Sequence, residues 1–326
     1  MINGIMDFAA RAIIQGTPIL FGATGEILTE KSGNLNLGIP GIMYVGMISS
    51  VIGGFAYQNT GNINPALAII IPMLCCLLGS LIVSFIYAFL TITLRANQNV
   101  TGLAITTFGV GFGNFFGGSL IKITNSSVPS LSLTKIGRVF AGRTLVPEEA
   151  PWYEHLLLPL GFMVYVAVVI SIIVGFVLKR TRVGLQLRAV GESPATADAA
   201  GVNVTKYKYY STCIGGMIAG LGGLFYIMDY SSGIWSNNAF GDRGWLAIAL
   251  VIFAIWRPGI AIIGSYIFGG LYVLGSRSDV STTMIPIMQM LPYIVTIVVL
   301  IITSLRKRRE TQPPASLGLN YFREDR

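Results

Sequence analysis

Long apolar runs alternate with short polar segments along most of the chain. A helix that crosses a bilayer needs about 20 mostly apolar residues. Seven runs reach this length, near 8–28, 41–57, 66–92, 100–121, 157–178, 206–228 and 286–305. The stretch 244–275 differs, because Arg257, Pro258 and Gly259 divide it into two shorter apolar runs. The pattern predicts an all-α, polytopic membrane helix bundle of about eight to ten membrane elements, some of them short or broken.

The first two apolar runs are separated by the polar sequence GEILTEKSGNLNLGIPG at 25–41. GEILTEK reads as the end of the first helix. The following residues include Gly38, Pro40 and Gly41, which disfavour a regular helix. We therefore expect residues 34–41 to be non-helical. Irregular backbone at membrane depth must be buried in protein or line a watery cavity.

Composition and charge agree with a membrane protein and suggest its orientation. Charged residues make up 11% of the chain, against about 25% in soluble domains. The net charge of +8 comes from Lys and Arg in short loops and in the tail, the pattern that orients membrane helices. This predicts a transmembrane domain over 1–310, with a cytoplasmic loop at 179–208 and an external loop at 122–156. Residues 311–326 would be a cytoplasmic tail, and the N-terminus would lie outside.

The loop at 179–208 contains the signals of one short helix. Ser193 is a good N-cap, Pro194 suits the first helical position, and Gly201 supplies a stop. Such a helix has only about two turns and is marginal alone. It therefore needs a surface to pack against. A plain connecting loop whose cations set topology remains the alternative.

The same loop carries a family resemblance. LRAVGESPATADAAGVNVTKYKYY resembles the cytoplasmic loop of bacterial ABC-importer permeases of the nucleoside and simple-sugar group, which are related to branched-chain amino acid permeases. GEILTEKSGNLNLGIPGIMYVG and FGDRGWLAIALVIFAIWRPG resemble two further blocks of the group, and ANQNVTGLAITTFGVG resembles the shorter of its two paired permease types. The chain departs from the group at Pro40 and Gln98, where relatives often carry Glu.

The resemblance implies a type II ABC-importer permease fold in the bacterial cytoplasmic membrane, with the C-terminus in the cytoplasm. It implies a neutral polar substrate, a nucleoside first and a simple sugar next. The partners would be a second permease in a heterodimer, a cytoplasmic ATPase that binds ATP and Mg, and an extracytoplasmic substrate-binding lipoprotein. The residues expected to couple to the ATPase are Arg188, Gly191, Glu192, Ser193, Pro194, Ala199 and Gly201.

The chain itself lacks the usual devices for chemistry. No Gly-x-x-x-x-Gly-Lys-[Ser/Thr] sequence is present to hold ATP phosphates. The three cysteines lie in apolar segments and the single His155 lies in a polar loop, so we expect no cofactor, no metal and no enzyme activity. A neutral polar solute is recognised by amides and hydroxyls. The candidates for its path are Asn34, Asn36, Asn97, Gln98 and Asn114, and the competing interpretation is helix capping and interhelical hydrogen bonding.

Charged residues bear on the alternative of a stand-alone secondary transporter. Broken helices fit that class. All candidate intramembrane charges lie near the predicted helix ends, where snorkelling suffices, and the sequence shows no paired membrane carboxylates that would relay protons. This counts against an ion-coupled carrier. The candidate charges are Asp7, Arg11, Glu26, Asp229, Asp242, Arg243 and Arg257.

Overall fold

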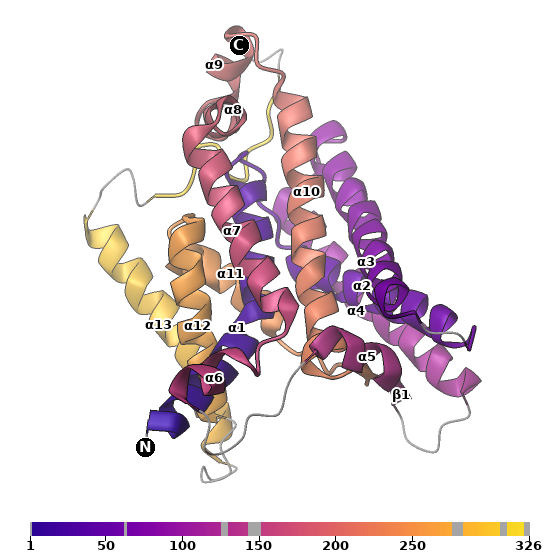
Figure 1. The fold of residues 1–326 in the computed structure, drawn as a ribbon. Helices are drawn as coiled ribbons and strands as arrows, with labels where there is room; N and C mark the ends of the chain where they lie inside the picture. The colour runs from indigo at the N-terminus through magenta and orange to yellow at the C-terminus, as the bar shows by residue number, and fades with distance from the viewer. Residues whose placement is uncertain are drawn as a thin grey trace.

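The computed structural model describes residues 2–61, 64–124, 130–142, 151–275, 283–306 and 312–322, which form a helix bundle (Figure 1). The longer helices are α1 (Ile2–Glu30), α2 (Ile39–Gln58), α3 (Pro65–Ala88), α4 (Gln98–Ile123), α7 (Phe162–Arg180), α10 (Val204–Phe225), α11 (Arg243–Phe253), α12 (Pro258–Gly275) and α13 (Ile285–Arg306). The shorter elements are η1 (Phe89–Thr93) and η2 (Tyr226–Tyr230), which are π-helical turns, α5 (Thr134–Ala141), α6 (Trp152–Leu157), α8 (Arg182–Glu192), α9 (Pro194–Ala199), β1 (Leu131–Ser132) and β2 (Ile234–Trp235).

The all-α, polytopic membrane architecture predicted from the sequence is confirmed. Six helices are long and apolar enough to cross a membrane: α2, α3 with η1, α4, α7, α10 with η2, and α13. Two shorter apolar helices, α11 and α12, and the long buried helix α1 complete the bundle. The described residues therefore supply nine membrane elements, within the expected eight to ten.

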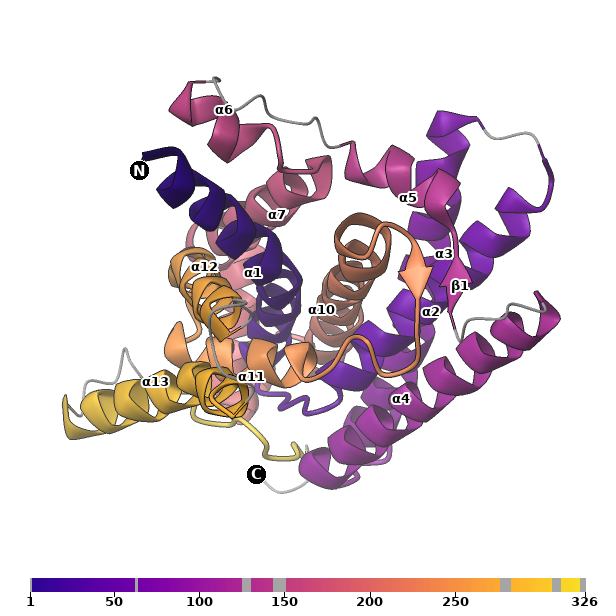
Figure 2. The same cartoon turned by 90° about the horizontal axis from the view of Figure 1, so that it is seen from below.

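Helices α1, α2 and α10 form the centre of the bundle, and α3, α4, α7 and α13 lie around them (Figure 2). Small residues allow the close approach of α1 and α10. A Cβ added at Gly25 would overlap the Gly215 carbonyl, and one added at Gly215 would overlap the Gly25 carbonyl. Glycine at both positions brings the two backbones into direct contact, as in other membrane helix pairs.

The break after α1 is shorter than the sequence predicted. Helix α1 ends at Glu30, and Gly33 adopts a left-handed conformation with φ +84°. Residues 31–38 are non-helical, but α2 already begins at Ile39. The expectation that Pro40 and Gly41 are non-helical is therefore wrong. Pro40 fits the first helical turn because its missing N–H would have no partner there, and Gly41 packs against the backbone of α4 at Ile105.

The second predicted break is present as a tight turn between two short helices, but it lies at 254–257, and the prediction that Pro258 and Gly259 interrupt the helix is wrong because both belong to the first turn of α12. Helix α11 ends at Phe253 and α12 begins at Pro258. Between them, Ile255 and Trp256 have φ values of +53° and +51°. Left-handed conformations are unusual for such bulky residues, and here they reverse the chain.

The two ends of the bundle carry different elements (Figure 1). Helices α8 and α9 lie at one end with the C-terminal segment, and this end is called the α9 end below. The opposite end holds the N-terminus, α5 and α6. There β1 pairs with β2, and His155 Nδ1 lies 3.1 Å from Asp7 Oδ1. The described residues of 122–156 and the segment 229–240 therefore lie at one end, away from 179–208, and which end faces the cytoplasm stays a prediction.

Helix α8 was not predicted. The sequence suggested a polar loop with a single short helix, whereas α8 precedes that helix and packs its Leu187 and Val190 inward. Its apolar face is narrow and its other positions are polar, so the pattern resembles a loop. Thr181 caps its start by accepting a hydrogen bond from Gly184 N at 3.1 Å.

Candidate functional site

Helix α9 has the local structure that the sequence predicts. Ser193 Oγ accepts a hydrogen bond from Thr196 N at 3.4 Å, and Pro194 occupies the first turn. Gly201 stops the helix with φ +83°. Capping alone explains why these residues form a helix. Their role in coupling to an ATPase therefore stays a prediction.

The chain itself supports this short helix. Ala197 of α9 packs with Val190 of α8 and Val204 of α10 in a small core, and Tyr321 from the tail packs against it. The chain itself therefore supplies at least part of the surface that this short helix needs to pack against. The opposite side of α9 remains exposed, including Ala199.

The seven predicted coupling residues divide between the exposed surface and the interior. Arg188, Glu192, Ala199 and Gly201 are exposed, and Ser193 and Pro194 are half-buried. Gly191 is buried, and a Cβ there would overlap the Lys31 carbonyl. Gly191 is therefore a packing position between α8 and the loop after α1.

Lys31 links this loop electrostatically to the end of α8. Burial lowers the pKa of the Lys31 ammonium from its ordinary value, the Glu192 carboxylate opposes this change, and Arg188 reinforces it. Two of the predicted coupling residues thus act on a lysine of the α1–α2 loop. A partner that bound Glu192 would change the charge balance around Lys31.

The tail ties several elements together at the α9 end, which sequence reasoning missed. Ser316 N and Oγ donate to the Gly191 carbonyl at 3.0 and 2.5 Å. Gly318 N donates to the Gly33 carbonyl at 3.2 Å. Tyr321 OH donates to Asp198 Oδ2 at 2.8 Å. The tail therefore bridges the α1–α2 loop, α8 and α9, and no local pattern in the sequence announces these contacts.

Asn34 and Asn36 lie inside the bundle, fully buried. Asn34 Nδ2 donates to Thr212 Oγ1 of α10 at 3.1 Å. Asn36 Oδ1 accepts from Gly38 N at 2.9 Å. Asn34 Oδ1 and Asn36 Nδ2 have no hydrogen-bond partner among the described residues. Each amide thus supports the loop with one atom and leaves a second buried polar atom unused.

The other three path candidates do not join them in one site. Gln98 Oε1 accepts from Leu35 N at 2.7 Å, so Gln98 contacts the same loop. Asn97 caps α4 by accepting from Val100 N at 3.1 Å. Asn114 lies 16 residues beyond Gln98 on α4, about 24 Å at the helical rise. It accepts from Tyr44 OH at 2.8 Å. The five candidates thus mark one buried loop and two separate helix positions.

Two buried carboxylates overturn one sequence prediction. Glu26 and Glu30 lie one turn apart on α1 and are buried. Glu26 Oε1 accepts from Asn36 N at 3.0 Å, and Trp256 Nε1 donates to Glu30 Oε2. Paired carboxylates therefore do occur inside the bundle. The sequence alone did not reveal this pair, because it places both glutamates near the end of a helix. It does not show whether that helix end lies inside the bundle or at the membrane surface.

Arg243 is likewise buried and does not snorkel to water. Its guanidinium lies 4.5 Å from the ring centre of Tyr226 and 4.8 Å from that of Tyr272. Its Nη1 donates to the Phe240 carbonyl at 2.9 Å. Aromatic faces and carbonyls thus hold the cation. Across the described residues, no group of three or more His, Cys, Asp or Glu side chains could hold a metal ion.

Comparison with known proteins gives this architecture a family. Residues 8–303 match the family described as the branched-chain amino acid transport system permease component. The chain is 33% identical to a putative glucose ABC transporter permease of Haloferax volcanii, over 98% of this chain and 99% of the relative. It is 31% identical to the nucleoside ABC transporter permease NupC of Lactococcus lactis, over 99% of each chain.

A third relative is the guanosine ABC transporter permease NupQ of Bacillus subtilis, 29% identical over 88% of this chain and 89% of the relative. No solved structure matches the chain. The family match begins in the first turns of α1 and ends within the last turn of α13. It therefore includes both the buried loop and the α8–α9 hairpin. The chain belongs to the permease-component family of the branched-chain amino acid transport systems.

Proposed function

We propose that the chain is the membrane permease subunit of an ATP-driven importer for a neutral polar solute, a nucleoside first and a simple sugar next. The observation that carries this proposal is the end-to-end similarity to NupC, a permease named for nucleosides. The relative named for glucose supports the wider class of neutral, hydroxyl-rich solutes. Buried amides such as Asn34 and Asn36 suit such a solute better than charged groups would.

The α9 end is the proposed docking face for a separate ATPase, which would bind ATP and Mg. Glu192 and Ala199 are exposed there, on the two arms of the α8–α9 hairpin. Lys and Arg gather at this end, which favours a cytoplasmic position for α9 and for the C-terminus. Closure of the ATPase would then move the hairpin as a unit, since the tail fixes it to the α1–α2 loop.

A second permease is part of the proposal. NupC and NupB of Lactococcus lactis both match the chain, at 31% and 21% identity. NupQ and NupP of Bacillus subtilis do the same, at 29% and 24%. In each organism the chain is more similar to one member of the two, which supports pairing with a different permease. An extracytoplasmic binding lipoprotein would deliver the solute to the opposite end.

Uptake and complex formation test the docking face. We expect Ala199→Asp to abolish co-purification of the ATPase and to lower ATP-dependent uptake by about tenfold or more, because a buried interfacial charge is costly. Arg182→Ala, at the exposed start of α8, is the control and should leave both unchanged. Normal co-purification and uptake with Ala199→Asp would refute the docking assignment.

A proton-coupled carrier is the second candidate, because Glu26 and Glu30 form the buried carboxylate pair that such carriers use. The two classes differ in their energy source. In sealed vesicles, the proposed importer needs ATP and its partner subunits, and collapse of the proton gradient leaves its uptake intact. Uptake by this chain alone that disappears with the proton gradient would establish the carrier instead.

A further inference from the structure

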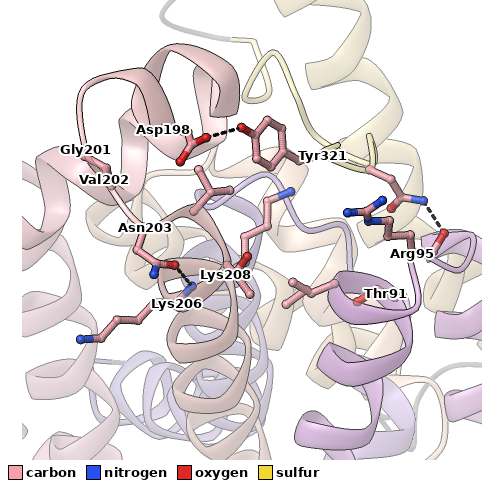
Figure 3. A pocket seen from close by; sticks show the side chains of 13 residues that line it. Thr91, Arg95, Asp198, Gly201, Val202, Asn203, Lys206, Lys208 and Tyr321 are labelled. Carbon is pink, nitrogen blue, oxygen red and sulfur yellow. Dashed lines mark hydrogen bonds between the residues drawn. The ribbon is translucent and has the colours of Figure 1, made fainter. Parts of the chain in front are cut away.

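A polar cavity of about 590 Å³ lies at the α9 end, beside the end of α9 at Asp198 and Gly201 (Figure 3). Its walls come from three distant parts of the chain. These are the segment from η1 to Arg95, the turn from α9 into α10, and the tail at Asn320 and Tyr321. A cavity built from separate elements changes shape when any one of them moves.

Lys208 is the unusual member of this lining. The residue is 3% exposed. Figure 3 shows the ammonium pointing away from α10 into the space beside Tyr321. Among the described residues, no carboxylate or other acceptor is seen in a hydrogen bond or ion pair with the Lys208 ammonium. A cation that faces a cavity from a largely buried residue loses much of its hydration, so a compensating anion in the cavity would be favoured.

Arg95 approaches the same space from the other side. Its guanidinium points toward Lys208 in Figure 3, and the ring of Phe322 lies 4.5 Å from it. The backbone of Arg95 has φ +55°, a conformation that costs energy for a residue of this type. The Arg95 carbonyl accepts from Asn320 Nδ2 at 2.6 Å, which anchors this strained residue to the tail.

The charges around the cavity are unbalanced. Asp198 is the one acidic residue in the described lining, and its Oδ2 already accepts from Tyr321 OH. Lys206 also borders the cavity but is exposed, lies 5.7 Å from the ring centre of Tyr210, and points outward in Figure 3. The inward cations are therefore Lys208 and Arg95, and an anion between them would offset their mutual repulsion.

We propose that this cavity binds a phosphate group between Lys208 and Arg95. Lysine and arginine are the residues that proteins use for phosphate, the first as a compact charge and the second as a planar donor. Two cations match the double negative charge of a phosphate. The group belongs either to a soluble phosphate compound or to the headgroup of an anionic lipid, since the cavity opens at the end of membrane helices α3 and α10.

Binding there would have a mechanical consequence. A phosphate held by both cations joins the start of α10 to the η1–α4 connection and to the tail that Arg95 supports. It would therefore stiffen the α9 end. The proposal needs no ATPase, so its outcome is independent of the importer assignment.

The test uses the full chain in nanodiscs of phosphatidylcholine, with thermal unfolding measured as inorganic phosphate is raised at constant ionic strength. We expect phosphate to raise the unfolding temperature of the wild type and to have no effect on Lys208→Met. Lys206→Met, two residues away on the same helix, is the matched control and should respond like the wild type. Arg95→Gln, which removes a charge at an exposed position, should weaken phosphate binding by about tenfold.

A lipid source is tested in nanodiscs that contain phosphatidic acid, with retained lipid measured by mass spectrometry after purification. Retention that depends on Lys208 and not on Lys206 supports a headgroup, and a response to free phosphate supports a soluble ligand. The proposal is overturned if neither probe distinguishes Lys208→Met from Lys206→Met. It is also overturned if phosphate acts only after residues 323–326 are removed, because the chain's own Glu324 or Asp325 would then be the occupant.

Discussion

Helices α10 and α3 have similar lengths but opposite surroundings. With its π-helical turn η2, α10 covers Val204–Tyr230, and α3 with η1 covers Pro65–Thr93. In an apolar 18-residue window of each, 78% of the residues are buried in α10 and 28% in α3. The sequence of α3 is the more apolar of the two. In a membrane protein, therefore, the most hydrophobic helix need not be the most buried, and here it lies at the periphery.

The lipid that surrounds the bundle explains why the more apolar helix is the less buried one. Lipid tails are as apolar as leucine, so an apolar side chain gains little by turning inward. The buried helix is instead distinguished by small residues that allow close packing and by hydroxyls that bond across helices. In α10 these include Gly215, Gly220, Ser211 and Thr212. Leu78 and Ile82 of α3, by contrast, have exposed side chains that suit contact with lipid.

The largest expected effect breaks the α1–α10 contact. Gly215→Leu should prevent normal assembly, because a side chain there meets the Gly25 backbone and the helices must separate. Gly111→Leu on α4 is the control, since nothing lies within 4 Å of a Cβ at that position. Size-exclusion chromatography of the solubilised protein should show a monodisperse peak only for the control. A monodisperse, stable Gly215→Leu protein would contradict the packing described for α1 and α10.

A matched pair of leucines sharpens the contrast between the two helices. Leu224 at the end of α10 is fully buried, whereas Leu78 in α3 is 58% exposed. We expect Leu224→Ala to lower the free energy of unfolding by about 2–5 kcal/mol through the cavity it leaves. Leu78→Ala should change it by about 0.5 kcal/mol or less. Thermal unfolding in nanodiscs measures both, and equal shifts would show that α3 is covered by protein.

A smaller effect is expected from a hydroxyl inside the bundle. Thr212→Val removes the hydroxyl that accepts a hydrogen bond from Asn34 Nδ2. We expect it to lower the free energy of unfolding by about 1–3 kcal/mol, because the buried amide loses this hydrogen bond. Thr107→Val is the control on α4, where an exposed hydroxyl bonds only to the Leu103 carbonyl within its own helix. The same unfolding measurement applies. A cost no larger than that of the control would mean that water reaches Asn34.

The comparison also explains which features could be predicted from the sequence. Length and hydropathy locate spans such as α3 and α7, because lipid-facing helices are apolar on most sides. Proline chemistry locates the turn before Pro258, and cap chemistry locates α9 from Ser193. These signals are local. The same rules fail for α8, whose buried face is only a few residues wide.

The interior of the candidate site could not be predicted, for a related reason. Sequence places Glu26, Glu30 and Arg243 near helix ends, but only the packing of the whole bundle decides whether an end lies in water or in protein. The tail is similar. Ser316 and Gly318 bond through their backbone to residues more than 100 positions away, and backbone hydrogen bonds leave no mark in the side-chain pattern.

The tail also imposes an order on biosynthesis. Helix α8 leaves the ribosome well before Ser316, which later donates two hydrogen bonds to the Gly191 carbonyl. Domains generally fold from the N-terminus during synthesis, but this end of the molecule cannot be completed until α10 to α13 have been inserted and the last residues have emerged. The α8–α9 hairpin, which we propose as the docking face for an ATPase, is thus completed last. A chain whose insertion is incomplete would therefore lack the finished docking face.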